Sequence, residues 1–479
     1  MFLSRMAGRR VASALSSNSL RCTLRCFVTR RLGTSSTDRP SEEKARTGDG
    51  AFGGTPLQKE VGPLFGSSVV FDDANLQTDS IMLDGADPST QSVQPAASEY
   101  FIPQVPLHAL DGQQRKRVLL LCTGGTLTMA PDENGALAPV QGALIKYLQE
   151  MRELHDPLMP EVVAHEYQPF YDSSDLGPVD WTTLAKDIRA NYLHFDGFVV
   201  CMGTDTMAYT ATALSFMLEN LGKPVVFTGS QIPLCEPYND ARRNLIMALL
   251  FASRDTINEV SIFFHDRLLR ACRSTKVNTH SLMAFDSPKM EPLARIGIDI
   301  EENQHALSPP ARGALRVHTS MDTRLLTIHL VPGFDDGIIK DMIQNADGHR
   351  LKALVLKLYG TGNFPSVKES FVQLLADARE KGILVVAGSQ CHTGHVMMGH
   401  YATGRVLLEA GVVSGCDMTL EAIACKLGYL FGRGDLTVSQ VADLMNVSLR
   451  GEVTPIEALS PPPFSTAYQR AMKKGKIYF

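Results

Sequence analysis

Two groups of threonines and glycines in this 479-residue chain stand where a side-chain hydroxyl could attack a substrate. The TGGT turn (residues 123–126) directly follows the apolar run 117–122, and the GTDT loop (residues 203–206) follows the apolar run 197–202. Both runs have the composition of buried strands, so both groups should lie at the carboxyl ends of strands in a parallel α/β sheet, the edge where such sheets bind ligands. The glycines allow sharp turns and one threonine stands beside an aspartate. The pattern therefore predicts hydroxyl-nucleophile chemistry of the kind that hydrolyses amides.

Other polar side chains follow the neighbouring predicted strands and should share the same edge of the sheet. The set comprises Asp172, Ser173, Ser174, Ser230, Gln231 and, just beyond the last strand of the domain, Lys276. A threonine hydroxyl needs a base to remove its proton, and a buried lysine oriented by an aspartate can serve as one. Thr204, Lys276 and Asp205 therefore form a predicted relay. Open backbone N–H groups at the glycines would stabilise an oxyanion.

These groups require a framework of alternating strands and helices. In the first part of the framework, strands are predicted at 118–122, 164–167, 197–202, 224–227 and 260–264. The helices predicted between them cover 144–151, 181–191, 207–221 and 240–252. A second unit has predicted strands at 324–330, 351–358 and 383–387 and helices at 369–381, 418–430 and 437–446. Single helices between successive strands imply right-handed crossovers and parallel sheets.

Composition divides the chain into five parts. Residues 34–114 are rich in Ser, Thr, Gly, Pro and Asp without a sustained apolar period, which predicts a disordered segment. Residues 115–305 form the larger predicted α/β domain, 306–322 a linker, and 323–479 the smaller α/β domain. The fold class is thus α/β with two domains, and the larger, N-terminal domain is built on a parallel sheet.

The amino terminus differs from the rest of the chain. Residues 1–33 hold seven arginines and five serines but no lysine or acidic residue. Apolar residues are interspersed without a continuous core of the secretory type, which is the composition of a mitochondrial transit peptide. We therefore expect a mitochondrial protein; the alternatives are a disordered basic tail or a misassigned start, with the protein in the cytoplasm.

Charge and cysteine content limit the class of partner. The formal net charge of −5 gives no support to nucleic-acid binding, and no run of 18 apolar residues predicts a membrane span. The nine cysteines are dispersed and none forms a CxxC pair, which argues against both a disulfide framework and a zinc site. No G-x-G-x-x-G follows the first strand, so dinucleotide binding is not expected either.

The motifs also resemble a known family, the bacterial type I (cytosolic-type) asparaginase/glutaminase family. The two general signatures are CTGGTLT at 122–128 and GTDTMAY at 203–209, the latter followed by LSFMLENLGKP at 214–224. The type I features are FYDSSD at 170–175, TGSQIP at 228–233, TK at 275–276, YGTGN at 359–363, YATG at 401–404 and GCDMT at 415–419. One TGGT would be a weak signal. Both signatures, correctly spaced within a matching frame of more than 300 residues, are specific.

The resemblance implies roles for individual residues. It implies that Thr126 is the primary nucleophile and that Thr204, Asp205 and Lys276 are the second catalytic threonine with its aspartate and lysine. Asp172, Ser173 and Ser174 match the loop that binds the substrate's α-carboxylate and α-amino group. The implied reaction converts L-asparagine and water to L-aspartate and ammonia without a metal or organic cofactor, in a homodimer or homotetramer.

The sequence departs from the family pattern in two places. Many relatives carry a tyrosine or threonine in the mobile loop after TGGT, whereas residues 130–139 read APDENGALAP, with no hydroxyl near Ala136 or Leu137. A second, regulatory asparagine site would use Lys357, Tyr359, Asn363 and Cys391. Lys357 stands there where an arginine is common, so bidentate capture of a carboxylate would be lost.

Two other functions remain open at this point. An archaeal-type amidotransferase subunit, which releases ammonia for use on misacylated transfer RNA, shares the signatures but adds a compact β-rich domain that residues 34–114 do not resemble. A catalytically silent amino-acid sensor would keep the pocket, and the missing lid hydroxyl motivates that interpretation.

Overall fold

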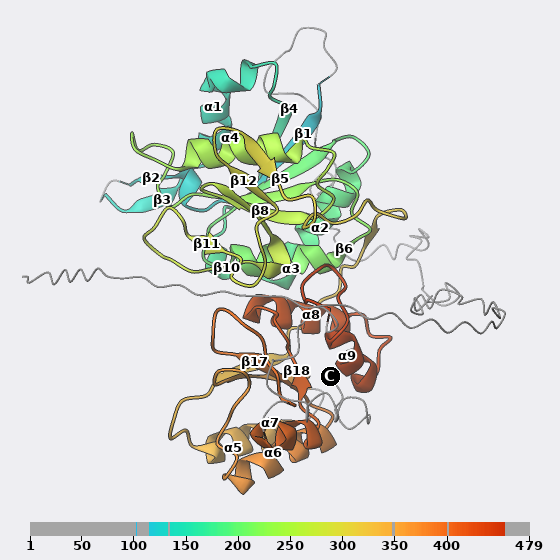
Figure 1. Ribbon diagram of the computed structural model, residues 1–479. Coiled ribbons are helices and arrows are strands. Elements are labelled where there is room, and N and C mark those ends of the chain that lie inside the picture. The colour runs from blue at the N-terminus through green and yellow to red at the C-terminus, as the bar shows by residue number, and fades with distance from the viewer. Residues whose placement is uncertain (1–101, 103–114, 133–134, 347–349, 400–401, 456–479) are drawn as a thin grey trace, which may run out of the picture. The chain divides into compact units, whose positions relative to one another are not determined.

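The structure is a computed structural model that describes residues 102, 115–132, 135–346, 350–399 and 402–455. The expectations for residues 1–33, for nearly all of 34–114 and for 456–479 lie outside the described residues. Figure 1 labels the helices and strands used below.

The N-terminal domain is built on an eight-stranded sheet with the order β13-β12-β9-β8-β7-β5-β1-β4. Five strands are mutually parallel: β4 (Glu161–Glu166), β1 (Arg117–Cys122), β5 (Gly197–Cys201), β7 (Val225–Thr228) and β8 (Val260–Phe264). The other three are antiparallel: β9 (Arg267–Arg270), β12 (Ala294–Ile296) and β13 (Ile300–Glu302). The sheet is therefore mixed. The prediction of a parallel sheet holds only for the five strands from β4 to β8 in the sheet order.

A short connection explains the change of direction. Only His265 and Asp266 join β8 to β9, and His265 adopts φ 58° in this turn. Two residues can link antiparallel neighbours, whereas a parallel partner requires a long crossover, usually a helix. No strand was predicted in the N-terminal domain after residue 264, so the three antiparallel strands are a finding of the structure.

Helices cover both faces of the central strands, which is why these strands are apolar throughout. Along β1, Leu119 and Leu121 point to one core, and Val118 and Leu120 to the other. The first core contains α2 (Pro178–Asn191) and α3 (Met207–Met217), and the second contains α1 (Ala143–Glu150) and α4 (Ala241–Ala252). Figure 1 shows α4 above the central strands and α3 below them.

The third predicted helix is shorter than expected. It ends at Met217 rather than at residue 221, because Leu218–Glu219 form the short strand β6. This strand pairs with β14 (Arg316–Val317), which lies in the segment predicted as a linker. Pairing with a segment about 100 positions away thus overrides the local helical pattern.

The C-terminal domain is a four-stranded parallel sheet flanked by helices. Its order is β15-β16-β17-β18, with β15 at Leu325–His329, β16 at Ala353–Leu358, β17 at Leu384–Ser389 and β18 at Val413–Ser414. The helices are α5 (Asp336–Asn345), α6 (Glu369–Glu380), α7 (Ala402–Glu409), α8 (Leu420–Gly432) and α9 (Val438–Met445). Of these elements, α5, α7 and β18 had not been predicted.

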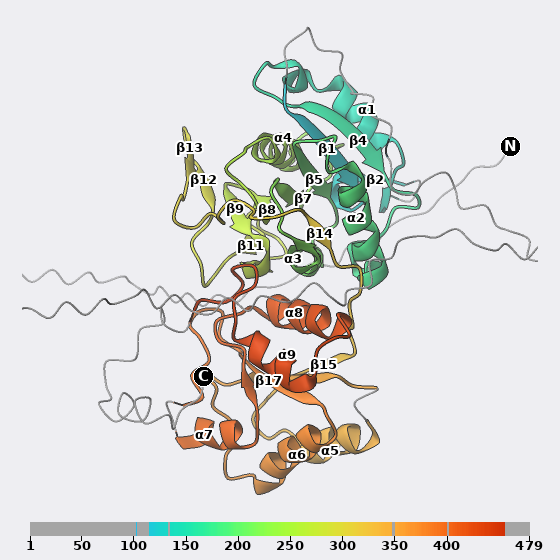
Figure 2. The same ribbon diagram turned by 90° about the vertical axis from the view of Figure 1, so that its right-hand side faces the viewer.

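Helix α8 also packs against the N-terminal domain. The rings of Phe216 on α3 and Tyr429 on α8 stack with centroids 5.8 Å apart, and the Cys425 thiol lies 3.4 Å from the Tyr209 carbonyl oxygen. Figures 1 and 2 both show α8 next to α3. The first core of the N-terminal domain thereby continues into the C-terminal domain. None of the helices described is long and apolar enough to cross a bilayer.

Candidate active site

Two glycines let the TGGT turn and the GTDT loop touch. Gly125 has φ +89°, and a Cβ atom added to it would lie 2.3 Å from the backbone nitrogen of Gly203. A Cβ atom added to Gly203 would in turn lie 2.7 Å from the Oγ of Ser173. Any side chain at either glycine would force these loops apart. Three segments predicted to lie at strand ends therefore meet at one point.

Thr126 lies in the first turn after β1. It begins the 3-10 helix Thr126–Thr128 and is half-buried. No hydrogen bond of its hydroxyl to another described residue is seen, which leaves the oxygen available to a substrate. Thr128, in contrast, is buried and its hydroxyl donates to the Gly125 carbonyl oxygen at 3.0 Å. Thr128 therefore holds the turn closed and is not a substitute for the missing lid hydroxyl.

Lys276 joins the two other predicted members of the relay. Its Nζ lies 2.8 Å from Thr204 Oγ1 and 2.6 Å from Asp205 Oδ1. The lysine side chain is only 14% exposed, whereas that of Asp205 is 70% exposed, so the carboxylate faces the solvent side of the site. Lys276 is carried by β10 (Thr275–Lys276), which pairs with β11 (Phe285–Asp286). Asp205 does not cap α3: its N-cap is Thr206, without a side-chain capping bond.

The segment after β4 brings further polar groups to the same place. Asp172 accepts hydrogen bonds from the backbone N–H and the hydroxyl of Ser174, each at 2.9 Å. These bonds, the backbone one first, lower the pKa of the Asp172 carboxyl, which therefore stays ionised at neutral pH. Ser173 is buried, and its carbonyl oxygen accepts a hydrogen bond from the Thr206 hydroxyl. Asp172 and Ser174 remain exposed and can meet a ligand.

Contacts to the C-terminal domain hold the strand that carries Lys276. The Thr275 hydroxyl donates to Glu421 Oε1 at 2.6 Å, and Arg273 Nη1 lies 2.7 Å from Asp417 Oδ2. Arg273 and Asp417 are 4% and 6% exposed, so this ion pair is buried. None of these partners was predicted, because nothing in the local pattern of Arg273 or Thr275 indicates which distant carboxylate it meets.

The proposed regulatory residues lie at the ends of β16 and β17. Lys357 is half-buried on β16, and burial lowers the pKa of its ammonium. Tyr359 and Asn363 form a tight turn through two backbone hydrogen bonds, and Cys391 is exposed just after β17. A further lysine, Lys289, interacts electrostatically with Lys357 and was not among the predicted site residues. Burial, then the charge of Lys357, lower the pKa of Lys289 to about 8.

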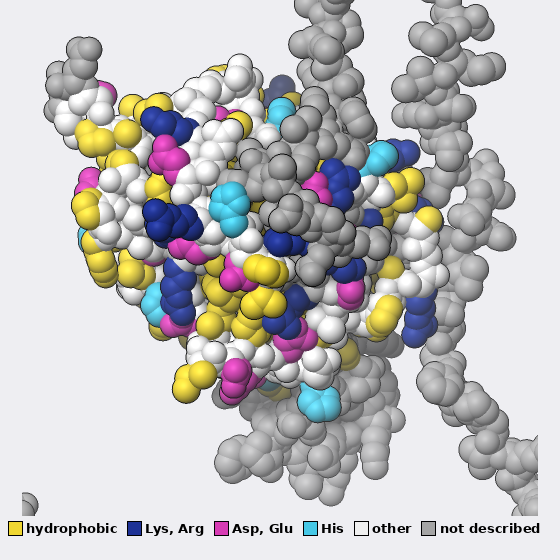
Figure 3. All heavy atoms as spheres, turned by 90° about the horizontal axis from the view of Figure 1, so that it is seen from above, with side chains coloured by type: hydrophobic (Ala, Val, Ile, Leu, Met, Phe, Trp, Pro, Cys, Tyr) yellow, Lys and Arg dark blue, Asp and Glu magenta, His cyan; other side chains and the backbone are white. Residues whose placement is uncertain are grey.

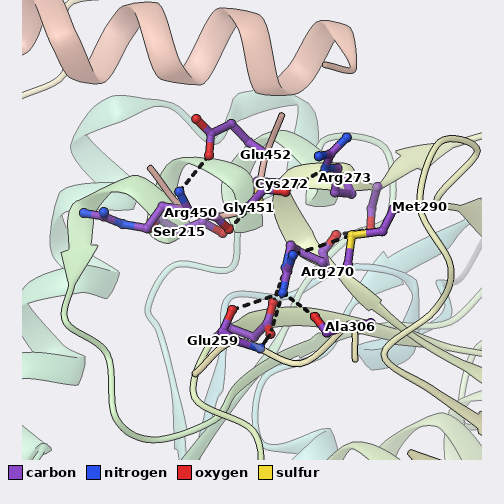
Figure 4. A network of polar contacts seen from close by, with 12 residues as sticks. Ser215, Glu259, Arg270, Cys272, Arg273, Met290, Ala306, Arg450, Gly451 and Glu452 are labelled. Carbon is purple, nitrogen blue, oxygen red and sulfur yellow. Dashed lines mark hydrogen bonds and ion pairs between the residues drawn. The ribbon is translucent and has the colours of Figure 1, made fainter. Parts of the chain in front are cut away.

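A cavity of about 490 Å³ lies apart from this site. It is next to the start of β8, whereas the site follows the carboxyl ends of the strands. Figure 4 shows the polar network at its wall, in which Arg270 Nε bonds Glu259 Oε2 at 2.5 Å and Arg270 also donates to the Ala306 carbonyl oxygen. These buried charges are satisfied within the protein, which is the arrangement of a structural network.

In the part of the chain that the structure describes, neither the charge pattern of the visible surface nor the grouping of possible metal ligands indicates a further site. On the face seen in Figure 3, basic and acidic side chains are interspersed, with no broad area of one sign among the coloured atoms. Within the described residues, no group of three or more His, Cys, Asp or Glu side chains is placed to hold a metal ion.

Comparisons with known proteins agree with this architecture. Residues 117–308 match the family described as Asparaginase, N-terminal, and residues 324–445 match the Glutaminase/Asparaginase C-terminal domain. L-asparaginase 1 of Escherichia coli strain K12 is 45% identical over 342 residues, which is 71% of this chain and 99% of that protein. The crystal structure of L-asparaginase I from Vibrio cholerae is similar with a TM-score of 0.66 and 42% identity, over 71% of this chain and 100% of that one. A glutamyl-tRNA(Gln) amidotransferase component of Methanobrevibacter smithii is 33% identical over 71% of this chain and 77% of that protein.

The fold and these matches define a class, the two-domain asparaginases and glutaminases. Within that class the chain belongs to the type I L-asparaginase family.

Proposed function

We propose that this protein hydrolyses L-asparagine to L-aspartate and ammonia, with Thr126 as the nucleophile. The proposal rests mainly on the two hydrogen bonds that Lys276 Nζ makes to Thr204 Oγ1 and Asp205 Oδ1. Thr204 and Asp205 lie on the GTDT loop, whose Gly203 contacts Gly125 of the TGGT turn. The 45% identity to Escherichia coli L-asparaginase 1 supports the choice of substrate.

The chemistry proceeds through an ester on Thr126. Its hydroxyl oxygen attacks the side-chain amide carbon, the C–N bond breaks, and the proton released by the hydroxyl leaves with the nitrogen as ammonia. Water then attacks the ester carbon, the bond from this carbon to the Thr126 oxygen breaks, and a proton from the water restores the Thr126 hydroxyl as L-aspartate is released. Thr204, Lys276 and Asp205 relay protons in both steps, and such general-base assistance contributes about 10²–10⁴-fold to the rate.

The substrate's backbone groups are bound by the exposed polar residues around the relay. The largely exposed carboxylate of Asp205 suits the α-ammonium group. The low pKa of Asp172 keeps a second negative charge there. The α-carboxylate would take the hydroxyl hydrogen bond that Ser174 gives to Asp172 in the structure, and the buried Ser173 completes this loop. The ionic contact at the α-ammonium and the hydrogen bond at the α-carboxylate together orient the side-chain amide towards Thr126.

The test is ammonia release from L-asparagine, with L-glutamine alongside, by the full-length protein and its Thr126→Ala variant. We expect turnover by the wild type and its loss in the variant. Thr183→Ala is the matched control, because Thr183 is partly exposed on α2 and its hydroxyl donates to the Val179 carbonyl oxygen, away from the site. Turnover that survives Thr126→Ala would assign the nucleophile to Thr204 instead.

The same assay separates the alternatives. A sensor, suggested by the absence of a hydroxyl at Ala136 or Leu137 in the hairpin formed by β2 (Met129–Pro131) and β3 (Leu137–Pro139), would bind asparagine without turnover. The 33% identity to the Methanobrevibacter smithii protein motivates the second alternative, an amidotransferase component. Such a component would release ammonia only with its partner and a charged transfer RNA.

A second asparagine site and an oligomeric assembly would add regulation to this activity. We propose a homodimer or homotetramer in which Lys357, Tyr359, Asn363 and Cys391 bind a second asparagine. The exposed Cys391 and the half-buried Lys357 at neighbouring strand ends support such a site. A sigmoidal dependence of rate on asparagine that Lys357→Met makes hyperbolic would support it, and light scattering of the purified protein gives the assembly.

A further inference from the structure

Gln231 connects two parts of the active site that the relay itself does not join. Its Oε1 lies 3.4 Å from Thr204 Oγ1, and its Nε2 lies 3.3 Å from the Ser281 carbonyl oxygen. Ser281 belongs to the tip of the hairpin formed by β10 and β11, and β10 carries Lys276. We propose that Gln231 is a positioning residue that fixes the hydroxyl of Thr204 relative to Lys276, an inference that rests on the proposed function of these two residues.

The contacts form a closed ring. Thr204 contacts Gln231, Gln231 contacts Ser281, the hairpin leads from Ser281 back to Lys276, and Lys276 Nζ contacts Thr204 at 2.8 Å. In such a ring each contact limits how far its neighbours can move apart. The distance between the relay lysine and its threonine is therefore set partly by Gln231, although Gln231 contacts only one of the two.

The direction of each hydrogen bond is determined by chemistry. A carbonyl oxygen only accepts, so the amide nitrogen of Gln231 must face Ser281 and the amide oxygen must face Thr204. The oxygen of Thr204 accepts a hydrogen bond from Lys276 Nζ, and the Thr204 hydroxyl donates to Gln231 Oε1. Each group from Lys276 to Ser281 thus donates to the next, and the rotation of the Thr204 hydroxyl about its C–O bond is fixed.

Both ends of the bridge are held by the protein. The Asp240 carboxylate, 8% exposed as a residue, accepts hydrogen bonds from the backbone N–H of Gln231 at 3.1 Å and of Ile232 at 3.0 Å. On the other side, Asn278 Oδ1 accepts from the backbone N–H of Ser281 at 2.8 Å and so orders the hairpin tip. The bridge therefore joins two ordered loops, and removing the Gln231 side chain leaves the backbone anchors in place.

The experiment measures kcat and KM for asparagine in the full-length protein. Gln231→Met keeps the length of the side chain and removes both hydrogen bonds, and we expect kcat to fall about 10- to 100-fold with KM within about twofold. Gln231→Glu keeps the acceptor for Thr204 but loses the donor to Ser281, so kcat should be intermediate. The matched control is Gln373→Met, on the exposed face of α6, where the Gln373 amide donates to Asp377.

A double-mutant cycle tests the ring directly. Asn278→Ala removes the acceptor that orders the tip, so it should lower kcat in the same direction but by less. If the tip acts through Gln231, Asn278→Ala has no further effect in the Gln231→Met background. Strict additivity of the two changes would overturn the proposal, as would a rise in KM at unchanged kcat, which would make Gln231 a substrate contact. Thermal unfolding midpoints within about 2 °C of the wild type show that the variants are folded.

Two further variants separate this inference from the proposed function. If Thr126→Ala and Lys276→Met abolish turnover while Gln231→Met equals the wild type, the role of Gln231 is wrong and the proposed function stands. If Lys276→Met leaves turnover unchanged, the relay itself is wrong and the inference fails with it.

Discussion

At the level of single residues, the two signatures of the family are as much about packing as about catalysis. Thr126 and Thr204 supply the hydroxyls. The glycines directly before them, Gly125 and Gly203, determine how closely the two loops that carry these threonines approach each other. Because Gly125 and Gly203 are in backbone contact, the loops that carry the proposed nucleophile and the proposed relay are packed against each other. The sequence could indicate that both glycines are needed in turns; their contact with each other follows only from the adjacency of β1 and β5.

This contact makes a prediction for Gly125→Ala. The added Cβ atom would lie 2.3 Å from the Gly203 nitrogen at a φ of +89°, so the turn must shift. We expect kcat to fall about 100-fold or more and the stability to fall by about 3 kcal/mol. Ammonia release and thermal unfolding measure both. Gly177→Ala is the control, since no atom lies within 4 Å of a Cβ at that position and its φ is negative; equal losses in both variants would contradict this account.

Among the elements, the short strand pair β6–β14 ties the connection between the domains to α3. Glu219 on β6 lies 2.7 Å from His318 Nε2 and 3.0 Å from Arg316 Nη2. The hydrogen bond to His318 and the charges of Arg450 and Arg316 lower the pKa of Glu219 to about 2. Two residues of strand would be marginal alone, and these ionic contacts supply part of their stability.

The pH dependence of that contribution follows from the sign of the shift. The folded pKa lies below the unfolded value of about 4.5, so the folded protein binds fewer protons and the stabilisation is complete above pH 4.5. It is lost as the pH falls from about 4.5 to 2. We expect Glu219→Gln to lower the stability by about 2–3 kcal/mol at pH 7 and by much less near pH 2. Urea unfolding at both pH values tests this, with the exposed Glu380→Gln as control; a loss independent of pH would contradict the linkage.

In the molecule as a whole, the described contacts make the C-terminal domain a support for Lys276, the lysine of the proposed relay. Arg273 and Thr275 reach Asp417 and Glu421 near the start of α8, and Lys276 is the next residue along the chain. The Arg273 guanidinium also donates to the Gly451 carbonyl oxygen at 2.6 Å. The strand that carries the lysine is thus held by a domain that contributes none of the four predicted catalytic residues.

Breaking this support should affect both stability and catalysis. Arg273→Met would leave the Asp417 carboxylate buried without its partner, which costs about 3–5 kcal/mol. Asp417→Leu should cost a similar amount, and the double variant less than the sum of the two. Thermal unfolding gives these values, and kcat at a temperature where every variant is folded gives the catalytic effect. Simple addition of the two losses would show that the pair does not act as a unit.

The amino terminus yields a prediction that does not depend on the fold. Its seven arginines without acidic residues favour mitochondrial import. We expect residues 1–33, fused to a fluorescent protein, to direct it to mitochondria and the same segment with its arginines changed to glutamine to fail. A diffuse cytoplasmic signal from the unchanged segment would contradict the targeting proposal.

Local sequence was enough to locate the strands and loops that carry the candidate site residues, whose chemistry stays a prediction. Apolar runs followed by TGGT and GTDT located β1 and β5 and their loops, because buried parallel strands and strand-end glycines have local signatures. Features that depend on partners distant in the sequence emerged only in the folded chain. The antiparallel strands β9, β12 and β13, the early end of α3 at Met217, the bond from Thr275 to Glu421 and the bridge at Gln231 all arise from such pairings. No local pattern specifies them, since a strand or a polar side chain can satisfy its hydrogen bonds with many partners and the packing of the whole chain selects one.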